Sequence, residues 1–314
     1  MKALVTGGAG FIGSHLAEAL ARRDVDVTVL DDLSGGSEAN LAWRLAGAPV
    51  ELVKGSVADA SLLARLLPGC DWVFHQAAMP SVPRSVAEPL LSNARNLDAT
   101  LQLLVASRDA GVKRFAFASS SAIYGDSEVS PKHEGLPPNP LSPYGLQKYA
   151  AERYGQLFHQ LYGLPTVALR YFNVFGPRQA FDSPYSGVIA RFCTSFLRGE
   201  PPVIFGDGTQ SRDFTYVDNV VAANLAAVEV PESQVAGQVF NVAGGNSITL
   251  LDLVQSLSSI SGRALSPVLH PARAGDVKHS RADISAAQRA LAYTPSVDWS
   301  EGLRRTYEWY RGKG

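Results

Sequence analysis

The chain has 314 residues, of which 46% are hydrophobic and 18% charged, enough apolar material for one large globular domain or two smaller ones. Its formal net charge of −1, without any run of five like charges, excludes the broad electrostatic surface that nucleic acid or anionic lipid requires. The longest apolar stretches, such as Pro165 to Val174, fall short of the ~20 apolar residues of a membrane helix. We therefore expect neither nucleic acid nor a membrane as a partner.

Up to Arg170 the chain alternates short β-branched or apolar runs with longer helical patterns. We expect strands over residues 3–6, 25–30, 50–54, 72–75, 114–119 and 166–170. Repeated strand, helix, strand units predict an α/β fold with a doubly wound parallel sheet, the Rossmann arrangement, over residues 1–172. Proline- and glycine-rich stretches with short helices follow Asn173. They indicate a smaller α/β lobe over 173–314, from which residues 213–243 return to the first domain.

A glycine-rich loop follows the first expected strand. The residues 6–13, TGGAGFIG, place Gly7, Gly10 and Gly13 three apart, directly before an amphipathic helix expected over 11–23. Glycines allow a sharp turn and a close approach to a pyrophosphate, whose charge is met by free N–H groups at the helix start. The second strand ends in Asp31-Asp32, where a carboxylate can accept hydrogen bonds from ribose hydroxyls and would repel a 2′-phosphate. The loop therefore predicts a dinucleotide site for NAD rather than NADP.

A tyrosine and a lysine stand four residues apart at the start of a later helix. Pro143 opens this helix, so Tyr144 and Lys148 share one face, a turn apart. A nearby ammonium and a positive nicotinamide ring favour the phenolate and lower the phenol pKa from about 10, so that the tyrosine can act as a general base. Alone, this spacing is typical of an exposed aromatic beside a solvated charge. However, Ser119–Ser121 follows the fifth strand, at the sheet edge where ligands bind, and the combination predicts an active site.

Seven motifs in order resemble the extended short-chain dehydrogenase/reductases of the NAD-dependent epimerase/dehydratase family, over essentially the whole chain. They are TGGAGFIG (6–13), HQAA (75–78), SSSAIYG (119–125), SPYGLQK (142–148), LRYFNVFGPRQ (169–179), GDGTQSRDFTYVDN (206–219) and RAGDVKHSRADIS (273–285). The resemblance implies that Tyr144 is the catalytic acid/base, that Lys148 supports it and binds the nicotinamide ribose, and that Ser120 assists at the sugar.

The same resemblance implies which residues contact NAD. Besides Tyr144 and Lys148, they are Gly7, Gly10, Phe11, Ile12, Gly13, Asp31, Asp32, Ser34, Gly35, Ser56, Val57, Gln76, Ala77, Ala78, Asn96, Ser119, Tyr171 and Phe172. Ser56 is a departure, because relatives often carry an aspartate there that touches adenine. We expect this departure to weaken affinity without changing the reaction.

The residues after Ser120 separate the branches of this family. Dehydratases carry an Asp-Glu pair there, and decarboxylases tend to place a glutamate in this segment, whereas this chain has Ser121 and Ala122. Oxidation and re-reduction at one sugar carbon is therefore favoured. The resemblance implies a UDP-hexose 4-epimerase, in which Tyr144 removes the 4-hydroxyl proton while hydride moves to NAD, and hydride returns to the other face of the rotated 4-keto sugar.

The second lobe carries candidates for the UDP-sugar. Arginine suits phosphate oxygens, and a carboxylate suits ribose hydroxyls. By resemblance, Arg212 and Arg273 hold the diphosphate and uridine with Asp276, Phe205 lies beside the base and Asn173 near the phosphates. The full substrate set is Ser81, Ser121, Asn173, Gln179, Gly187, Val188, Phe205, Gln210, Arg212, Arg273, Asp276 and Ser280.

The sugar itself is indicated by Ser280, four residues after Asp276. A small residue at this position leaves room for an N-acetyl group, and Gln179, Gly187 and Ser280 most resemble the UDP-N-acetylglucosamine 4-epimerases. Pro80 is a departure, since a smaller residue is expected there. UDP-GlcNAc/UDP-GalNAc, UDP-Glc/UDP-Gal or both are therefore the expected pairs. UDP-uronic acid 4-epimerisation, another NAD-dependent dehydratase or reductase, and a non-catalytic NAD-binding protein stay open as alternatives.

The remaining residues give weaker indications. None of the six histidines stands at metal-ligand spacing with a carboxylate cluster, so no metal is expected. Cys70 and Cys193 suggest two free thiols in a reducing compartment, and the start of the chain has no signal-peptide pattern, so we expect a cytoplasmic protein. By resemblance, the helical patterns over 88–110 and from Ser142 onward pair with their copies in a homodimer.

Overall fold

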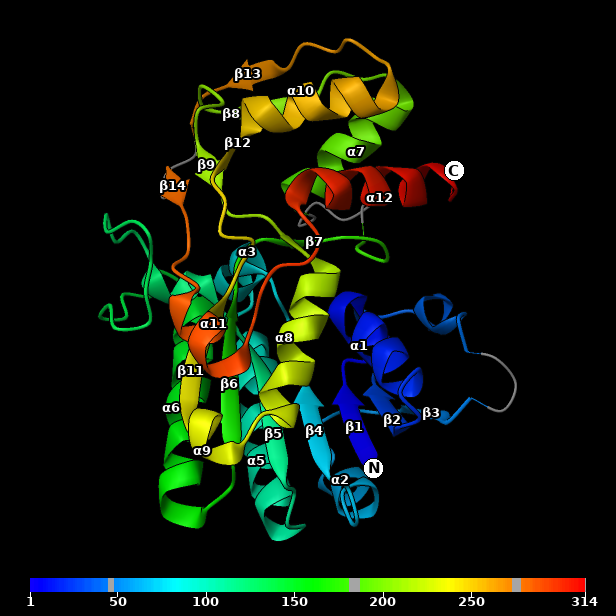
Figure 1. The fold of residues 1–314 in the computed structure, drawn as a ribbon, viewed down its shortest axis with the longest axis vertical. Coiled ribbons are helices and arrows are strands. Elements are labelled where there is room, and N and C mark those ends of the chain that lie inside the picture. The colour runs from blue at the N-terminus through cyan, green and yellow to red at the C-terminus, as the bar shows by residue number, and fades with distance from the viewer. Residues whose placement is uncertain (45–47, 181–186, 273–277, 314) are drawn as a thin grey trace.

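The computed structural model describes residues 1–44, 48–180, 187–272 and 278–313 (Figure 1). The predicted Arg273 and Asp276 lie outside the described residues. Within the described part, no helix is both long and apolar enough to cross a membrane.

A seven-stranded parallel sheet forms the lower part of the molecule, as the strand and helix pattern predicts. Its order is β11-β6-β5-β4-β1-β2-β3, and every neighbouring pair is parallel. All six expected strands are present within about one residue of their predicted bounds. The strands are β1 (Lys2–Thr6), β2 (Asp26–Asp31), β3 (Val50–Lys54), β4 (Trp72–His75), β5 (Arg114–Ser120), β6 (Thr166–Tyr171) and β11 (Gln238–Val242).

Helices cover both faces of this sheet (Figure 1). Successive side chains of a strand point to opposite faces, so the neighbours Leu4 and Val5 of β1 pack on different sides of the sheet. The side of Val5 is covered by α1 (Phe11–Ala21), α8 (Val217–Glu229) and α11 (Ser285–Leu291), whereas Leu4 packs on the other side. That side is covered by α2 (Ala60–Leu66), α5 (Ala99–Asp109) and α6 (Pro143–Tyr162). Burial on both faces explains why β1 reads as a continuous apolar run.

Short elements complete this part of the molecule. A nearly continuous helical stretch precedes α5, made of α3 (Val82–Ala87), α4 (Pro89–Asn93) and the π-helical η2 (Ala94–Asp98). The 3₁₀ turns η1 (Glu38–Leu41) and η3 (Ser121–Tyr124) follow β2 and β5, and α9 (Glu232–Val235) precedes β11. Ser142 caps α6 by accepting a hydrogen bond from the N–H of Gly145 at 3.1 Å, and Gly163 ends the helix at φ 71°.

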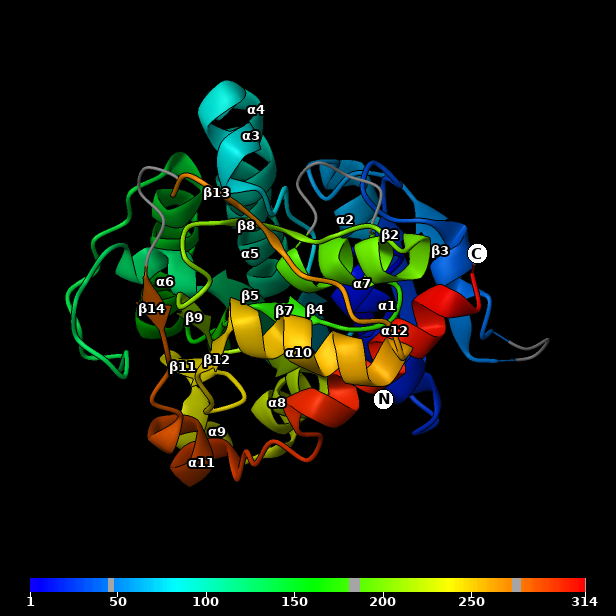
Figure 2. The same ribbon diagram turned by 90° about the horizontal axis from the view of Figure 1, so that it is seen from above.

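A second lobe lies above the carboxyl ends of the strands (Figures 1 and 2). Its core contains Phe192, Phe196, Leu253, Leu303 and Tyr307. These side chains come from α7 (Val188–Arg198), α10 (Leu250–Ser261) and α12 (Trp299–Arg311). Three small sheets accompany these helices. In one, β8 (Val203–Phe205) pairs with β13 (Val268–His270), and in another, β9 (Ser211–Arg212) lies between β12 (Ile248–Thr249) and β14 (His279–Ser280). In the third, β7 (Val174–Phe175) pairs with β10 (Thr215–Tyr216).

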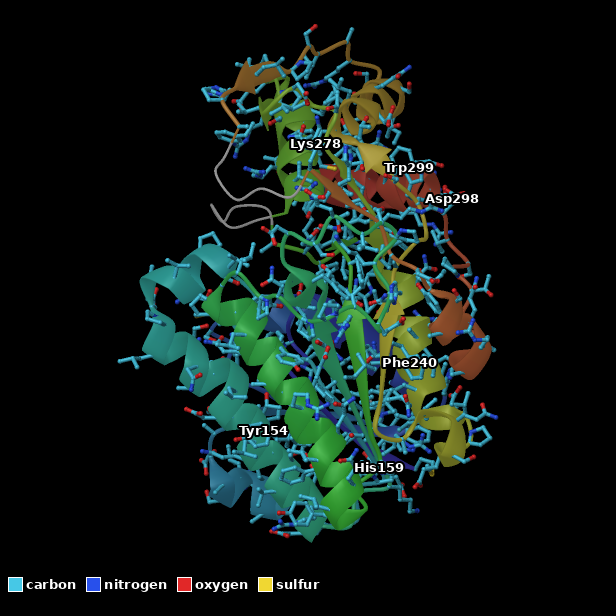
Figure 3. All side chains as sticks on the ribbon, turned by 90° about the vertical axis from the view of Figure 1, so that its left-hand side faces the viewer. Tyr154, His159, Phe240, Lys278, Asp298 and Trp299 are labelled. Atoms are coloured by element: carbon cyan, nitrogen blue, oxygen red, sulfur yellow. The ribbon has the colours of Figure 1, made fainter. Side chains whose placement is uncertain are left out.

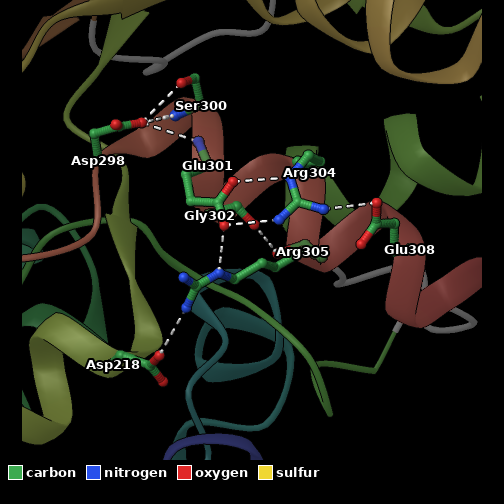
Figure 4. Close-up of polar contacts among 9 residues, drawn as sticks. Asp218, Asp298, Ser300, Glu301, Gly302, Arg304, Arg305 and Glu308 are labelled. Carbon is green, nitrogen blue, oxygen red and sulfur yellow. Dashed lines mark hydrogen bonds and ion pairs between the residues drawn. The ribbon is translucent and has the colours of Figure 1, made fainter.

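The helix α12 is tied to the lower part through charged side chains (Figure 4). Asp298 caps it by accepting hydrogen bonds from the N–H groups of Ser300 and Glu301, each at 2.9 Å. Glu301 in turn accepts from Arg305, which also lies 3.6 Å from the carboxylate of Asp218 on α8. Because these ion pairs are exposed, they contribute little to the stability of the fold, but they link α12 to α8.

Candidate active site

A cleft of about 1180 Å³ lies where the carboxyl edge of the sheet meets the second lobe. It collects residues that the sequence places far apart. The predicted residues that line it are Gly7, Gly10, Phe11, Ile12, Gly13, Asp31, Asp32, Ser34, Gly35, Ser56, Val57, Gln76, Ala77, Ala78, Ser81, Ser119, Ser120, Ser121, Tyr144, Lys148, Tyr171, Phe172, Asn173, Gln179, Gly187, Arg212 and Ser280.

The glycine loop forms one end of the cleft, and its geometry requires glycine. Gly7 has φ +66°, and a Cβ on it would lie 2.6 Å from the backbone nitrogen of Ala77. A Cβ on Gly13 would lie 2.2 Å from the carbonyl oxygen of Gly7. Gly10 has no side chain to cap α1, which leaves the first N–H groups of the helix for an anion. The loop thus fits the pyrophosphate of a dinucleotide.

The two aspartates after β2 differ in their contacts. The carboxylate of Asp31 accepts hydrogen bonds from the N–H groups of Ala9 at 2.9 Å and Leu33 at 2.8 Å, so it fixes the glycine loop, and burial raises its pKa. Asp32 is more exposed and lies 3.7 Å from the guanidinium of Arg95, which also donates to the hydroxyl of Ser34 at 3.0 Å. Both carboxylates line the cleft, where ribose hydroxyls can reach them.

Tyr144, Lys148 and Ser120 all line the cleft, and Tyr144 shares a hydrogen bond with Ser120. The N–H of Tyr144 donates to the hydroxyl of Ser85 at 3.1 Å, which sets the start of α6 against α3. The ammonium of Lys148 donates to the carbonyl of Ala118 at 2.8 Å and lies 6.0 Å from the centre of the Tyr144 ring. Burial lowers the pKa of Lys148 to about 8, against the opposing charge of Glu152.

The predicted lowering of the Tyr144 pKa includes the charge of a bound nicotinamide ring, and in the protein without NAD this pKa is raised instead. Burial raises it, and the hydrogen bond with Ser120 lowers it by a smaller amount. The cause is that taking the phenolate out of water costs more than the hydrogen bond with Ser120 returns.

A buried charge cluster lies behind the lysine. The carboxylate of Glu152 accepts a hydrogen bond from Ser119 at 2.5 Å and a bidentate pair from Arg170 at 2.8 and 2.7 Å. Side-chain exposure is only 2% for Glu152 and 4% for Arg170, and the guanidinium lies 4.8 Å from the ring centre of Tyr124. This cluster fixes the end of β5, next to Ser120. Glu152 was not predicted from the sequence, although it stands four residues after Lys148 on the same helix face.

Asn96 is the predicted cofactor residue that does not line the cleft. It is 1% exposed, and its amide clamps both polar backbone atoms of Met79, accepting from the N–H at 2.7 Å and donating to the carbonyl at 3.3 Å. Asn96 thus supports the cleft wall after β4 from behind.

The predicted substrate residues divide into two groups. Arg212 lines the cleft and donates to the carbonyls of Ser211 at 2.9 Å and Lys278 at 3.3 Å. Gln179 also lines it, and its buried side-chain oxygen has no hydrogen-bond partner among the described residues, so it is an acceptor suited to a ligand donor. Val188, Phe205 and Gln210 do not line it. Gln210 donates to the carbonyl of Phe205 at 2.5 Å, and the ring of Phe205 lies 5.6 Å from that of His270.

Several charged or aromatic residues line the cleft without having been predicted. They include Arg95, Lys132, Arg178, Trp309 and Lys313. Lys313, two residues after the end of α12, lies 4.9 Å from the centre of the ring of Trp309 on that helix. These residues stand singly in loops or helix ends, so only the tertiary fold brings them to the site.

The family model of the NAD dependent epimerase/dehydratase family matches residues 3–243. The UDP-glucose 4-epimerase of Mycolicibacterium smegmatis is 38% identical over 319 residues, covering 100% of this chain and 99% of that protein.

Solved structures with the same fold give closer matches. The UDP-N-acetylglucosamine 4-epimerase from Methanobrevibacter ruminantium M1, solved in complex with UDP-N-acetylmuramic acid, is 43% identical with a TM-score of 0.94, covering 100% of this chain and 99% of that one. The UDP-glucose 4-epimerase from Thermotoga maritima, solved with UDP-glucose, is 41% identical with a TM-score of 0.93 over the same shares. With the glycine loop, the two aspartates and the Ser-Tyr-Lys group in one cleft, these matches show that the chain belongs to the NAD dependent epimerase/dehydratase family.

Proposed function

We propose that the protein is a UDP-hexose 4-epimerase with NAD as its cofactor. The observation that carries this proposal is the position of Tyr144, which meets Ser120 at the end of β5 within the same cleft as the glycine loop. The similarity to UDP-sugar 4-epimerases over the whole chain supports it.

Each catalytic residue has a distinct task in this proposal. Tyr144 takes the proton from the 4-hydroxyl group of the sugar and later returns it, and Ser120 holds the same sugar oxygen by a hydrogen bond. Lys148 keeps a positive charge near the phenol and binds the nicotinamide ribose. The glycine loop and Asp31 would hold NAD, which would supply the oxidation and re-reduction of the sugar at carbon 4. Ser121 and Ala122 provide no acid for dehydration.

We further propose that the acetamido pair UDP-GlcNAc/UDP-GalNAc is accepted together with the plain hexoses. Ser280 lines the cleft, and its small side chain leaves room for an N-acetyl group. Gly187 and Gln179 line the same region, and the Cβ that any other residue would add at Gly187 would lie 3.4 Å from the amide nitrogen of Gln179. Gly187 therefore adds no side chain to this part of the cleft wall.

The test is to incubate the purified protein separately with UDP-N-acetylglucosamine and UDP-glucose and to follow the products by proton NMR. We expect galacto isomers without added NADH. Tyr144→Phe should lower the rate by about 10²- to 10⁴-fold, because it removes the acid/base. Tyr162→Phe, an exposed tyrosine at the far end of the same helix, is the matched control and should leave the rate unchanged. A product lighter by water or carbon dioxide, or net consumption of NAD, would contradict the proposal.

We also propose a homodimer, because the side of the molecule formed by α4, α5 and α6 carries an apolar surface. This side faces the viewer in Figure 3. Exposed leucines gather there, with Leu90 87%, Leu146 56%, Leu157 39% and Leu161 67% exposed. A second copy of the chain would cover them, since monomers rarely expose so many large apolar residues together.

The domain division and the location are proposed on the same footing. Residues 1–172 with 213–243 would form the NAD-binding domain, and the rest of 173–314 the UDP-sugar lobe; β11 and α8 on the main sheet support this division. The cytoplasm is proposed because Cys70 and Cys193 are both buried free thiols. Imaging of a tagged chain tests the location.

A further inference from the structure

Lys132 lies in the segment between η3 and α6. It is only 3% exposed and lines the cleft together with Ser121 and Tyr124. Because Ser121 directly follows Ser120, this part of the cleft is where the proposed function places the sugar. Lys132 belongs to none of the seven sequence motifs.

The backbone of Lys132 is held firmly by residues that follow Ser280. Its N–H donates to the carbonyl of Arg281 at 2.8 Å, and its carbonyl accepts from the N–H of Asp283 at 2.7 Å and from the side-chain amide of Asn241 at 3.0 Å. A parallel bridge joins it to Ala282. The position is therefore part of the same structure that presents Ser280 to the cleft, not a loose surface loop.

The ammonium of Lys132 has an incomplete set of partners. It donates to the carbonyl of Ser127, and among the described residues no ion pair includes it. Burial lowers its pKa, and the charge of Asp126 opposes this only in part. An ammonium has three donors, and a buried cation without a carboxylate is unfavourable. A ligand anion at this place would relieve that cost.

We propose that Lys132 binds a carboxylate carried by the hexose, so that the cleft accepts acidic UDP-sugars as well as neutral ones. This inference rests on the proposed function. A sugar hydroxyl or an acetamido oxygen could also accept a hydrogen bond from Lys132, but only an anion compensates the charge, and charge-assisted hydrogen bonds are roughly twice as strong. The diphosphate is a separate anion, which the proposed function assigns to Arg212 on β9.

The test compares wild type, Lys132→Met and Lys132→Arg with three sugar nucleotides and with UDP alone. UDP-glucose is neutral in its sugar, UDP-glucuronic acid has a carboxylate on carbon 6, and UDP-N-acetylmuramic acid has one on the carbon-3 substituent. Affinity is measured by calorimetry and turnover by NMR. Lys132→Met should weaken binding of at least one acidic sugar by roughly 10- to 100-fold, the loss of one hydrogen bond to a charged group. Affinity for UDP and UDP-glucose should change far less, and Lys132→Arg should retain the acidic sugar.

The outcomes separate this inference from the proposed function. The acidic sugar that loses affinity in Lys132→Met identifies the carboxylate that the lysine binds. Equal losses for acidic and neutral sugars would show that Lys132 only supports the fold, and so would overturn the inference; melting temperatures of both variants check folding directly. If wild type epimerises none of the sugars but Lys132 still discriminates in binding, the proposed function fails and the carboxylate site stands.

Discussion

Lys148 donates a hydrogen bond of 2.8 Å to the carbonyl oxygen of Ala118, the residue just before the serine cluster on β5. This bond holds the ammonium at the end of the strand, one turn along α6 from Tyr144. Ser120, two residues after Ala118 on β5, shares a hydrogen bond with the phenol of Tyr144. The strand end and the helix thus position the proton-transfer group together, and changes to either should be visible in its pH dependence.

We expect the rate of epimerisation to fall as pH rises through about 8, because the folded pKa of Lys148 lies near this value and the ammonium is lost above it. The charge of Glu152 raises this pKa, so Glu152→Gln should lower it further and move the alkaline limb to lower pH. A kcat profile over pH measures the shift. An unchanged limb in Glu152→Gln would show that Lys148 does not control it.

Glu152→Gln should also destabilise the fold by about 3–5 kcal/mol, since it leaves the guanidinium of Arg170 buried without its carboxylate. Glu229→Gln is the control, because its pair with Arg23 is exposed on both sides and should contribute less than about 1 kcal/mol. Urea unfolding gives both values. Equal effects from the two substitutions would contradict the role of the buried pair.

Gly13→Ala should destabilise the cofactor-free protein by about 1–3 kcal/mol, because its Cβ would lie 2.2 Å from the carbonyl oxygen of Gly7. Gly35→Ala, also on the cleft, has nothing within 4 Å of the added Cβ and should unfold like wild type. Unfolding is compared without NAD, so that only the loop geometry is measured. Similar stability of the two variants would mean that the loop can shift to accept a side chain.

Ser280→Tyr should lower kcat/KM for UDP-N-acetylglucosamine much more than for UDP-glucose, because the ring would fill the space proposed for the acetamido group. Ser280→Ala keeps that space and should retain both substrates. The NMR assay on the two sugars gives the ratio. The acetamido proposal is lost if Ser280→Tyr leaves this ratio as in wild type.

Leu157→Asp should convert the proposed dimer to a monomer, since it places a charge in the apolar face of α6. Leu251→Asp is the matched control: Leu251 is 42% exposed on α10, and Leu157 is 39% exposed. Sedimentation velocity distinguishes the two states. A wild-type monomer, or a Leu157→Asp dimer, would rule out this surface as the interface.

The sheet was predictable from sequence because its strands carry a strong local signal. Each of the six expected strands is an apolar run between helical patterns, and β1 is buried on both faces. β11 (Gln238–Val242) was not predicted as a separate strand, although it is as long as β1 and longer than β4. Only its pairing with β6 gives it a strand partner.

The site was predictable where the residues stand in a motif, and not where the fold brings single residues together. Gly7, Asp31 and Tyr144 belong to spaced patterns whose chemistry can be reasoned from sequence. Lys132 enters the cleft because its backbone pairs with Ala282, far along the chain, and no local pattern announces such a contact. Asn96 shows the opposite case: the resemblance assigned it to the cofactor, whereas its amide holds the backbone of Met79.

The pairing of β11 with β6 has a consequence for how the protein folds. Val167 on β6 lies opposite Gln238 on β11, so the intervening chain must leave the sheet, build much of the second lobe and return before the sheet edge is complete. Pairing strands that are so far apart in the sequence slows folding, and it makes the sheet depend on the chain that builds the lobe. No single cut in the chain can release two self-sufficient halves, and we expect the sheet and the lobe to melt as one cooperative unit.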